Sequence, residues 1–167
     1  MLYASAFAGV EQGPEVTYDT YVPLTLTWPR YHRTLEPPAV VLLRGPQGYL
    51  ELKLDTRSGE LLEIVIPSAA ATVKTLPDDF RPTSGQNYVP LVRAPEQDAI
   101  EVPNLHFKIH GDHLRITLHK QPEESYIGAD SVSFGVGAEG LLVSVILQWT
   151  PLEREHFLSS CSSVETV

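Results

Sequence analysis

Three histidines in one short segment are the residues of this sequence best suited to chemistry. His106, His110 and His113 lie on either side of Gly111-Asp112. Glycine followed by aspartate is typical of a two-residue hairpin turn, which places His110 opposite His113 and His106 further along the same face. Imidazole nitrogen is a preferred ligand of zinc and nickel. The spacing therefore raises the hypothesis of a metal site built from these three side chains.

The same hairpin also carries an argument against a metal. Lys108 is expected to face Arg115 across the two strands, within the same polar patch as the histidines. The positive charges of these two side chains would repel a metal cation bound beside them. A polar hairpin face exposed to water is the simpler interpretation, and the sequence predicts no metal and no other cofactor.

Other kinds of catalytic site have little support. The sequence lacks a Gly-x-Ser-x-Gly elbow, and its single cysteine, Cys161, lies among small residues near the end of the chain. Carboxylates are paired at 78–79 and 123–124, but adjacent loop residues rarely point together as an acid and a base must. No glycine-rich phosphate loop, zinc-finger set or EF-hand loop occurs. These absences favour a noncatalytic protein, although a site gathered from distant residues would leave no such pattern.

Two segments are candidates for contact with a partner. Tryptophan, tyrosine and arginine dominate the energetics of many protein interfaces. The first segment combines them in Trp28, Arg30, Tyr31 and Arg33, and the second is the acidic pair of Asp78 and Asp79. In the alternative interpretation of the first segment, Trp28 ends a strand and packs inward while the charged residues after it face water.

The elements that position these residues are predicted to be mostly strands. Apolar and polar residues alternate in three hairpin-like units, 50–66, 105–118 and 131–147, and in two further strands, 16–28 with a break near Pro23 and 40–43. The stretch 141–147 is apolar on both faces, which predicts a central strand. We expect a mostly β fold: a single antiparallel sheet, a sandwich or a partly closed barrel of about seven or eight strands, followed by one C-terminal helix.

The helix is predicted over 151–160, and two segments are predicted to be irregular. Thr150 and Glu153 have the spacing of a capping box, and Leu152, His156 and Phe157 are expected to cover the sheet. Prolines are frequent in 67–99, which predicts a long loop or a crossover with a short helix. The small polar residues 159–167 are expected to fray. Residues 1–167 together have the size of a single domain.

Composition narrows the classes of partner. The net charge is -9, and only 12 lysines and arginines are scattered over 167 residues, which disfavours nucleic acid and suits a basic protein. No apolar run approaches the roughly 20 residues of a membrane helix. The apolar first ten residues lack the positive charge that starts a signal peptide. A single cysteine closes no intramolecular disulfide, which fits a reducing compartment. Together these features lead us to expect a soluble cytoplasmic protein that binds no membrane.

The hairpins at 54–64 and 133–145, each with a glycine turn, and the helix start at 150–153 resemble small bacterial immunity-type proteins of toxin systems. The resemblance implies a stoichiometric inhibitor that covers the active site of a cognate toxin, and it carries over no functional residue. Our first hypothesis is therefore a noncatalytic protein-binding module whose acidic surface steers it onto a basic toxin. The second is a β-barrel that binds a small ligand or a metal through His106, His110 and His113, as a hydrolase or isomerase.

Overall fold

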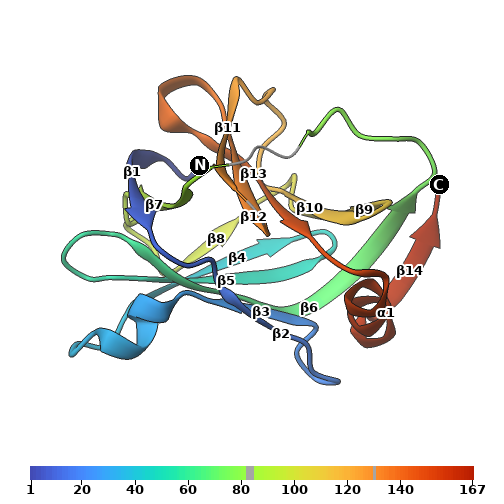
Figure 1. Cartoon of the computed structure of the whole chain (residues 1–167), viewed down its shortest axis with the longest axis horizontal. Helices are drawn as coiled ribbons and strands as arrows, with labels where there is room; N and C mark the ends of the chain where they lie inside the picture. The colour runs from blue at the N-terminus through green and yellow to red at the C-terminus, as the bar shows by residue number, and fades with distance from the viewer. Residues whose placement is uncertain (82–84, 130) are drawn as a thin grey trace.

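The computed structural model of the protein describes residues 1–81, 85–129 and 131–167 and consists mainly of strands (Figure 1). This part of the chain holds fourteen strands, two 3-10 helices and one α-helix. The strands are β1 (Ala4–Val10), β2 (Glu15–Thr17), β3 (Leu24–Thr27), β4 (Ala39–Gly45), β5 (Gly48–Leu54), β6 (Leu61–Lys74), β7 (Asn87–Val92), β8 (Ala99–Glu101), β9 (His106–His110), β10 (His113–Thr117), β11 (Ser125–Ala129), β12 (Val132–Val136), β13 (Leu142–Gln148) and β14 (Ser163–Thr166). The helices are η1 (Pro29–Arg33), η2 (Ala138–Gly140) and α1 (Pro151–Ser160).

Twelve of the strands form one large mixed sheet, in which β11-β12-β13-β10-β9-β6-β5-β4-β8 are neighbours in that order. Strands β3 and β14 also pair with β6, β2 pairs with β3, and β1 and β7 form a separate antiparallel pair. Three pairings are parallel: β6 with β9, β6 with β14, and β4 with β8. The predicted mostly β fold is confirmed. The prediction of a single antiparallel sheet of seven or eight strands is wrong, because segments with no alternating pattern also pair and some of them pair in parallel.

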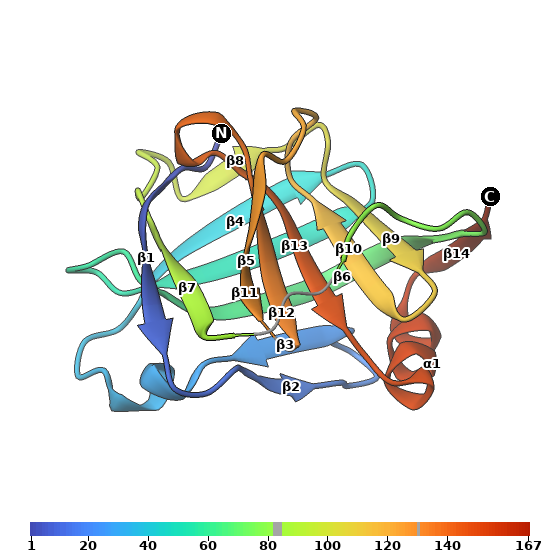
Figure 2. The same cartoon turned by 45° about the horizontal axis from the view of Figure 1, so that its top comes forward.

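Strand β6 joins the two halves of the large sheet. It is 14 residues long. Its residues up to Ala69 pair with β3 and β5, and those from Ala70 to Lys74 pair with β9 and β14 (Figures 1 and 2). Pro67 lies in the middle and has no N–H to donate. The pairing accommodates it, because the register with β5 shifts between Tyr49 and Glu51, across from the proline. A strand predicted to end before Pro67 therefore continues to Lys74.

The buried side chains form one apolar core between the curved halves of the sheet. Phe107, Phe134 and Phe157 are among its largest fully buried members. Strand β13 is buried over nearly its whole length and lies between β12 and β10, which confirms the predicted central strand. The three predicted hairpins are also confirmed as β5–β6, β9–β10 and β12–β13.

Helix α1 begins and ends where the sequence predicted, and the N–H of Glu153 donates to the Thr150 side chain. Phe157 is fully buried and packs on Trp149, with ring centroids 5.4 Å apart. Leu152 and His156 do not cover the sheet as predicted, because Leu152 is 65% exposed and His156 is exposed as well. None of the helices among the described residues is long and apolar enough to cross a membrane.

Two segments predicted to be irregular contain strands. Within 67–99, the second half of β6 comes first, and β7 later pairs with β1. Near the end of the chain, β14 pairs in parallel with β6, and the N–H of Val167 donates to the carbonyl of Val73. The expectation that 159–167 fray is therefore wrong. The polar side chains of β14 are all exposed, so this strand is held by its backbone rather than by an apolar face.

Candidate functional site

The histidine hairpin folds with the predicted register. The cross-strand pairs are His110 with His113, Lys108 with Arg115, and His106 with Thr117. Since successive side chains alternate between faces, these polar groups lie on the outer face of β9 and β10, while their apolar neighbours enter the core.

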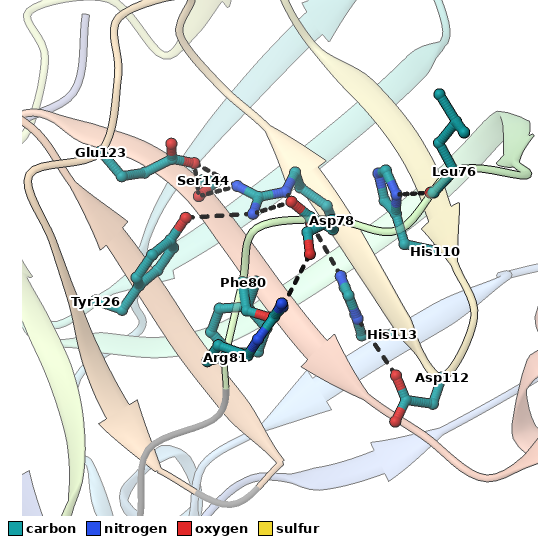
Figure 3. Close-up of polar contacts among 11 residues, drawn as sticks. Leu76, Asp78, Phe80, Arg81, His110, Asp112, His113, Glu123, Tyr126 and Ser144 are labelled. Carbon is teal, nitrogen blue, oxygen red and sulfur yellow. Dashed lines mark hydrogen bonds and ion pairs between the residues drawn. The ribbon is translucent and has the colours of Figure 1, made fainter.

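The segment 75–81 crosses this outer face and covers part of it (Figure 3). Its Asp78 carboxylate accepts two hydrogen bonds from Arg115, from Nε to Oδ2 at 2.7 Å and from Nη2 to Oδ1 at 3.0 Å. His113 Nε2 lies 3.0 Å from the same Oδ2 atom. His113 and Arg115 are only 8% and 9% exposed. The expectation of a solvated hairpin face is therefore wrong at these two residues, because a segment distant in sequence supplies the carboxylate that lets them be buried.

The remaining groups of the Arg115 guanidinium are also occupied. Its Nη1 group forms an ion pair with Glu123, and its Nη2 group donates to the Tyr126 hydroxyl at 3.3 Å (Figure 3). The Ser144 hydroxyl donates to the same Glu123 carboxylate at 2.9 Å. We call Asp78, His113, Arg115, Glu123, Tyr126 and Ser144 the Arg115 cluster. Its members come from the 75–81 segment, β10, the loop after β10, β11 and β13.

Both members of the central ion pair are held in their charged forms. Burial raises the pKa of Asp78, but hydrogen bonds from Arg115 and His113 lower it by more. The resulting pKa lies well below the usual range of a carboxyl group. Burial lowers the pKa of Arg115, but its bonds to Asp78 and Tyr126 outweigh that effect and raise it. A carboxylate with so low a pKa is a poor general base near neutral pH. The Arg115 cluster is therefore suited to holding the 75–81 segment on the sheet.

The ring of His113 is enclosed by aromatic neighbours. The His110 ring stacks on it with centroids 5.5 Å apart, and Phe80 contacts it edge-on at 5.5 Å. His113 Nδ1 lies 3.4 Å from a carboxylate oxygen of Asp112, so both ring nitrogens have partners. Among the described residues no three His, Cys, Asp or Glu side chains come together as metal ligands. The structure thus does not gather His106, His110 and His113 into one ligand set.

The first candidate segment for partner contact lies elsewhere, in η1 and the residue before it (Figure 2). Trp28 is 2% exposed and packs against Phe134, so it points inward as the alternative interpretation predicted. Arg30 forms ion pairs with Asp55 and Glu60. Tyr31 lies under the ammonium group of Lys53, and Arg33 is exposed. Burial removes Trp28 from the residues that a partner could touch.

Sequence reasoning missed Leu35, which follows η1 and is fully exposed. Its neighbour Glu36 accepts hydrogen bonds from Arg57 at 2.6 Å and from Thr56 at 2.9 Å, so the loop is tied to the β5–β6 turn. The signal in the sequence was a single leucine between polar residues and Pro37-Pro38, outside any alternating pattern. An isolated apolar residue of this kind is common at protein surfaces and stands out only when its exposure is known.

Asp79, the second residue of the acidic pair, is exposed, whereas Asp78 is drawn into the Arg115 cluster. Of the second acidic pair, Glu124 is exposed, whereas Glu123 is partly buried and pairs with Arg115. Cys161 donates from Sγ to the carbonyl of Phe157, and burial raises the pKa of its thiol to about 12. A thiol with this pKa has almost no thiolate at neutral pH, so Cys161 is a poor nucleophile.

No protein-family model matches the chain, and no curated protein is significantly similar to it. The functional argument therefore depends on the geometry of these residues.

Proposed function

We propose that the protein is a noncatalytic protein-binding module and, more narrowly, an immunity protein that covers the active site of a cognate toxin. The observation that carries the proposal is the loop after η1, where a fully exposed leucine lies between residues whose side chains are tied to the rest of the protein. Apolar anchors on pre-organised loops are what tight protein interfaces use, since little conformational entropy is lost when they bind.

The loop is anchored on both sides of Leu35. On one side Arg30 binds Asp55 and Glu60. On the other side Glu36 receives its hydrogen bonds from the β5–β6 turn. Around the apolar side chain, Arg30 and Glu36 are thus already paired within the protein, and Arg33 is exposed to water. A partner that buries Leu35 would meet a polar rim around an apolar centre, which is the usual anatomy of an interface.

The polar groups in the interior support a noncatalytic role. In the Arg115 cluster the carboxylates of Asp78 and Glu123 are bound to Arg115, and Ser144 is fully buried and donates to Glu123. A nucleophile needs an available base and access to its substrate. Ser144 has no access to a substrate because it is fully buried, and the carboxylate to which it donates is held in an ion pair with Arg115.

The experiment compares three forms of the tagged full chain: the unaltered protein, Leu35→Asp and the control Leu152→Asp. Leu152 is also a largely exposed leucine, but it lies on α1. Each form is incubated with extract of the source organism and with the purified products of neighbouring genes. The unaltered protein and Leu152→Asp are expected to recover one basic protein in near-equal molar amount, and Leu35→Asp at least tenfold less.

The outcomes separate the general proposal from the narrower one. Failure to recover any protein in near-equal amount, or equal recovery by Leu35→Asp, would overturn the binding module at this loop. The immunity role requires in addition that the recovered partner is toxic when expressed alone and harmless when co-expressed with the unaltered chain. A partner without toxicity would leave the binding module and overturn the immunity role.

A further inference from the structure

Three of the four lysines of this acidic protein lie around one cleft on the outer face of the sheet. Lys74 ends β6, Lys108 is in β9, and Lys120 follows β10. The parallel register of β6 and β9 pairs Lys74 with His110 and Thr72 with Lys108, which places both lysines on the face of the histidine hairpin. Within the described residues none of the three lysines forms an ion pair.

The acidic side chains at the cleft cancel only part of this charge. Asp78 and Glu123 share Arg115, which also lines the cleft and offsets one of their two negative charges. The lining thus holds four cations, the three lysines and Arg115, against the three carboxylates of Asp78, Asp79 and Glu123. A concave site with an excess of one charge concentrates its field on whatever enters. The cleft is therefore locally positive on a protein whose net charge is -9.

The lining also supplies neutral hydrogen-bond donors. Burial and the neighbouring Lys108 lower the pKa of His106, and burial lowers the pKa of His110. A neutral imidazole keeps one N–H that can donate to an anion. Asn104, His119 and Tyr126 also line the cleft. Lysine ammonium groups combined with such donors are suited to phosphate or carboxylate oxygens.

An apolar pocket shares a wall with the cleft. The cleft has a volume of about 490 Å³ and the pocket of about 380 Å³, and Asn104, His119 and Lys120 line both. The remaining wall of the pocket is mainly apolar and includes Leu2, Leu43, Ile100, Val102, Leu118 and Leu142. A positive cleft next to an apolar pocket has the two environments that an anionic amphiphile requires.

We infer that the cleft binds a small anionic amphiphile, with its phosphate or carboxylate group among Lys74, Lys108 and Lys120 and its apolar portion in the neighbouring pocket. This site is distinct from the loop around Leu35 and does not depend on the protein-binding role. Both kinds of head group present the same chemistry, oxygens with negative charge, to the lysines.

The test uses isothermal titration calorimetry on the full chain with four probes: octyl phosphate below its micelle concentration, octanoate, inorganic phosphate and 1-octanol. Octyl phosphate or octanoate is expected to bind at least tenfold more tightly than inorganic phosphate, because burying two methylene groups alone gives about that factor. Either amphiphile is also expected to bind more tightly than octanol, because octanol has the apolar chain but no negative charge for the lysines. The comparison of octyl phosphate with octanoate identifies which head group the lysines prefer.

Two variants locate the site. Lys108→Gln is expected to weaken binding of the better amphiphile at least fivefold. Arg93→Gln removes an exposed cation just after β7 and lowers the net charge by the same one unit, and it is expected to leave the affinity unchanged. Equal binding of octanol and the charged amphiphiles would overturn the role of the lysines. Equal binding of phosphate and octyl phosphate would overturn the role of the pocket. Equal effects of Lys108→Gln and Arg93→Gln would overturn the site itself.

Discussion

At the scale of single residues, Arg115 joins segments that are far apart in the sequence. It binds Asp78 from the segment after β6, Glu123 from the loop after β10 and Tyr126 from β11. Replacing a whole buried ion pair by apolar groups can be neutral, but removing one partner leaves a buried charge without compensation. The cluster thus makes the position of the 75–81 segment sensitive to single substitutions.

The variant Asp78→Asn tests this role. It leaves Arg115 with only Glu123 as a buried counter-charge, so we expect the free energy of unfolding at pH 7 to fall by about 3 kcal/mol in urea titrations. The control is the adjacent, exposed Asp79, for which the same substitution should change stability by less than about 0.5 kcal/mol. Similar losses in the two variants would contradict the assignment.

The same pair of variants gives a pH dependence. The pKa of Asp78 is lower in the folded protein than in the unfolded chain, since Arg115 and His113 stabilise its charged form. Its contribution to stability is therefore complete above the unfolded pKa of about 3.9 and is lost as the pH falls toward the folded value. The stability difference between the unaltered protein and Asp78→Asn should shrink below that pH. A difference that stays constant would contradict an electrostatic origin.

At the scale of elements, the sequence predicted local pairings and missed distant ones. The β9–β10 register followed from Gly111-Asp112, because a two-residue turn fixes which residues face each other. The pairing of β1 with β7 and of β14 with β6 has no such signal, since β7 contains Pro90 and β14 is short and exposed, with Val164 as its one apolar residue. The Arg115 cluster was missed for the same reason, because its members meet only once β11, β12, β13 and β10 lie side by side.

Two turn glycines allow a matched prediction about the hairpins. Gly59 and Gly111 both have positive φ, 76° and 55°. A Cβ atom at Gly59 would lie 2.4 Å from the carbonyl oxygen of Val92, whereas one at Gly111 meets no atom within 4 Å. Gly111→Ala is therefore expected to cost only the conformational strain, about 1 kcal/mol. Gly59→Ala should cost on the order of 3 kcal/mol, because it also pushes the β5–β6 turn away from β7.

Thermal and urea unfolding of the two glycine variants measure the difference. The N–H of Val92 donates to the carbonyl of Gly59 at 2.8 Å, so Gly59→Ala should also speed hydrogen exchange at Val92. Equal destabilisation by the two substitutions would show that the turn and β7 are not in close contact.

At the scale of the whole molecule, charge and apolar contact have separate roles. The net charge of -9 acts over a distance on any basic partner that approaches, while Leu35 acts only after contact. The local excess of lysines at the cleft does not alter the long-range field, because it is small beside the total charge. The two roles should therefore appear in different rate constants.

The association kinetics of the recovered partner test this separation by surface plasmon resonance. Raising the salt concentration from about 0.1 M to about 1 M shortens the Debye length from roughly 10 Å to roughly 3 Å, so the association rate constant should fall on the order of tenfold. The dissociation rate constant should change little with salt, since the buried contacts of Leu35 are apolar. Leu35→Asp should instead raise the dissociation rate constant and leave the salt dependence of association intact. If salt changed mainly the dissociation rate constant, charged groups of this chain would be in direct contact with the partner. The partner would then have to bind through carboxylates of this chain rather than through Leu35.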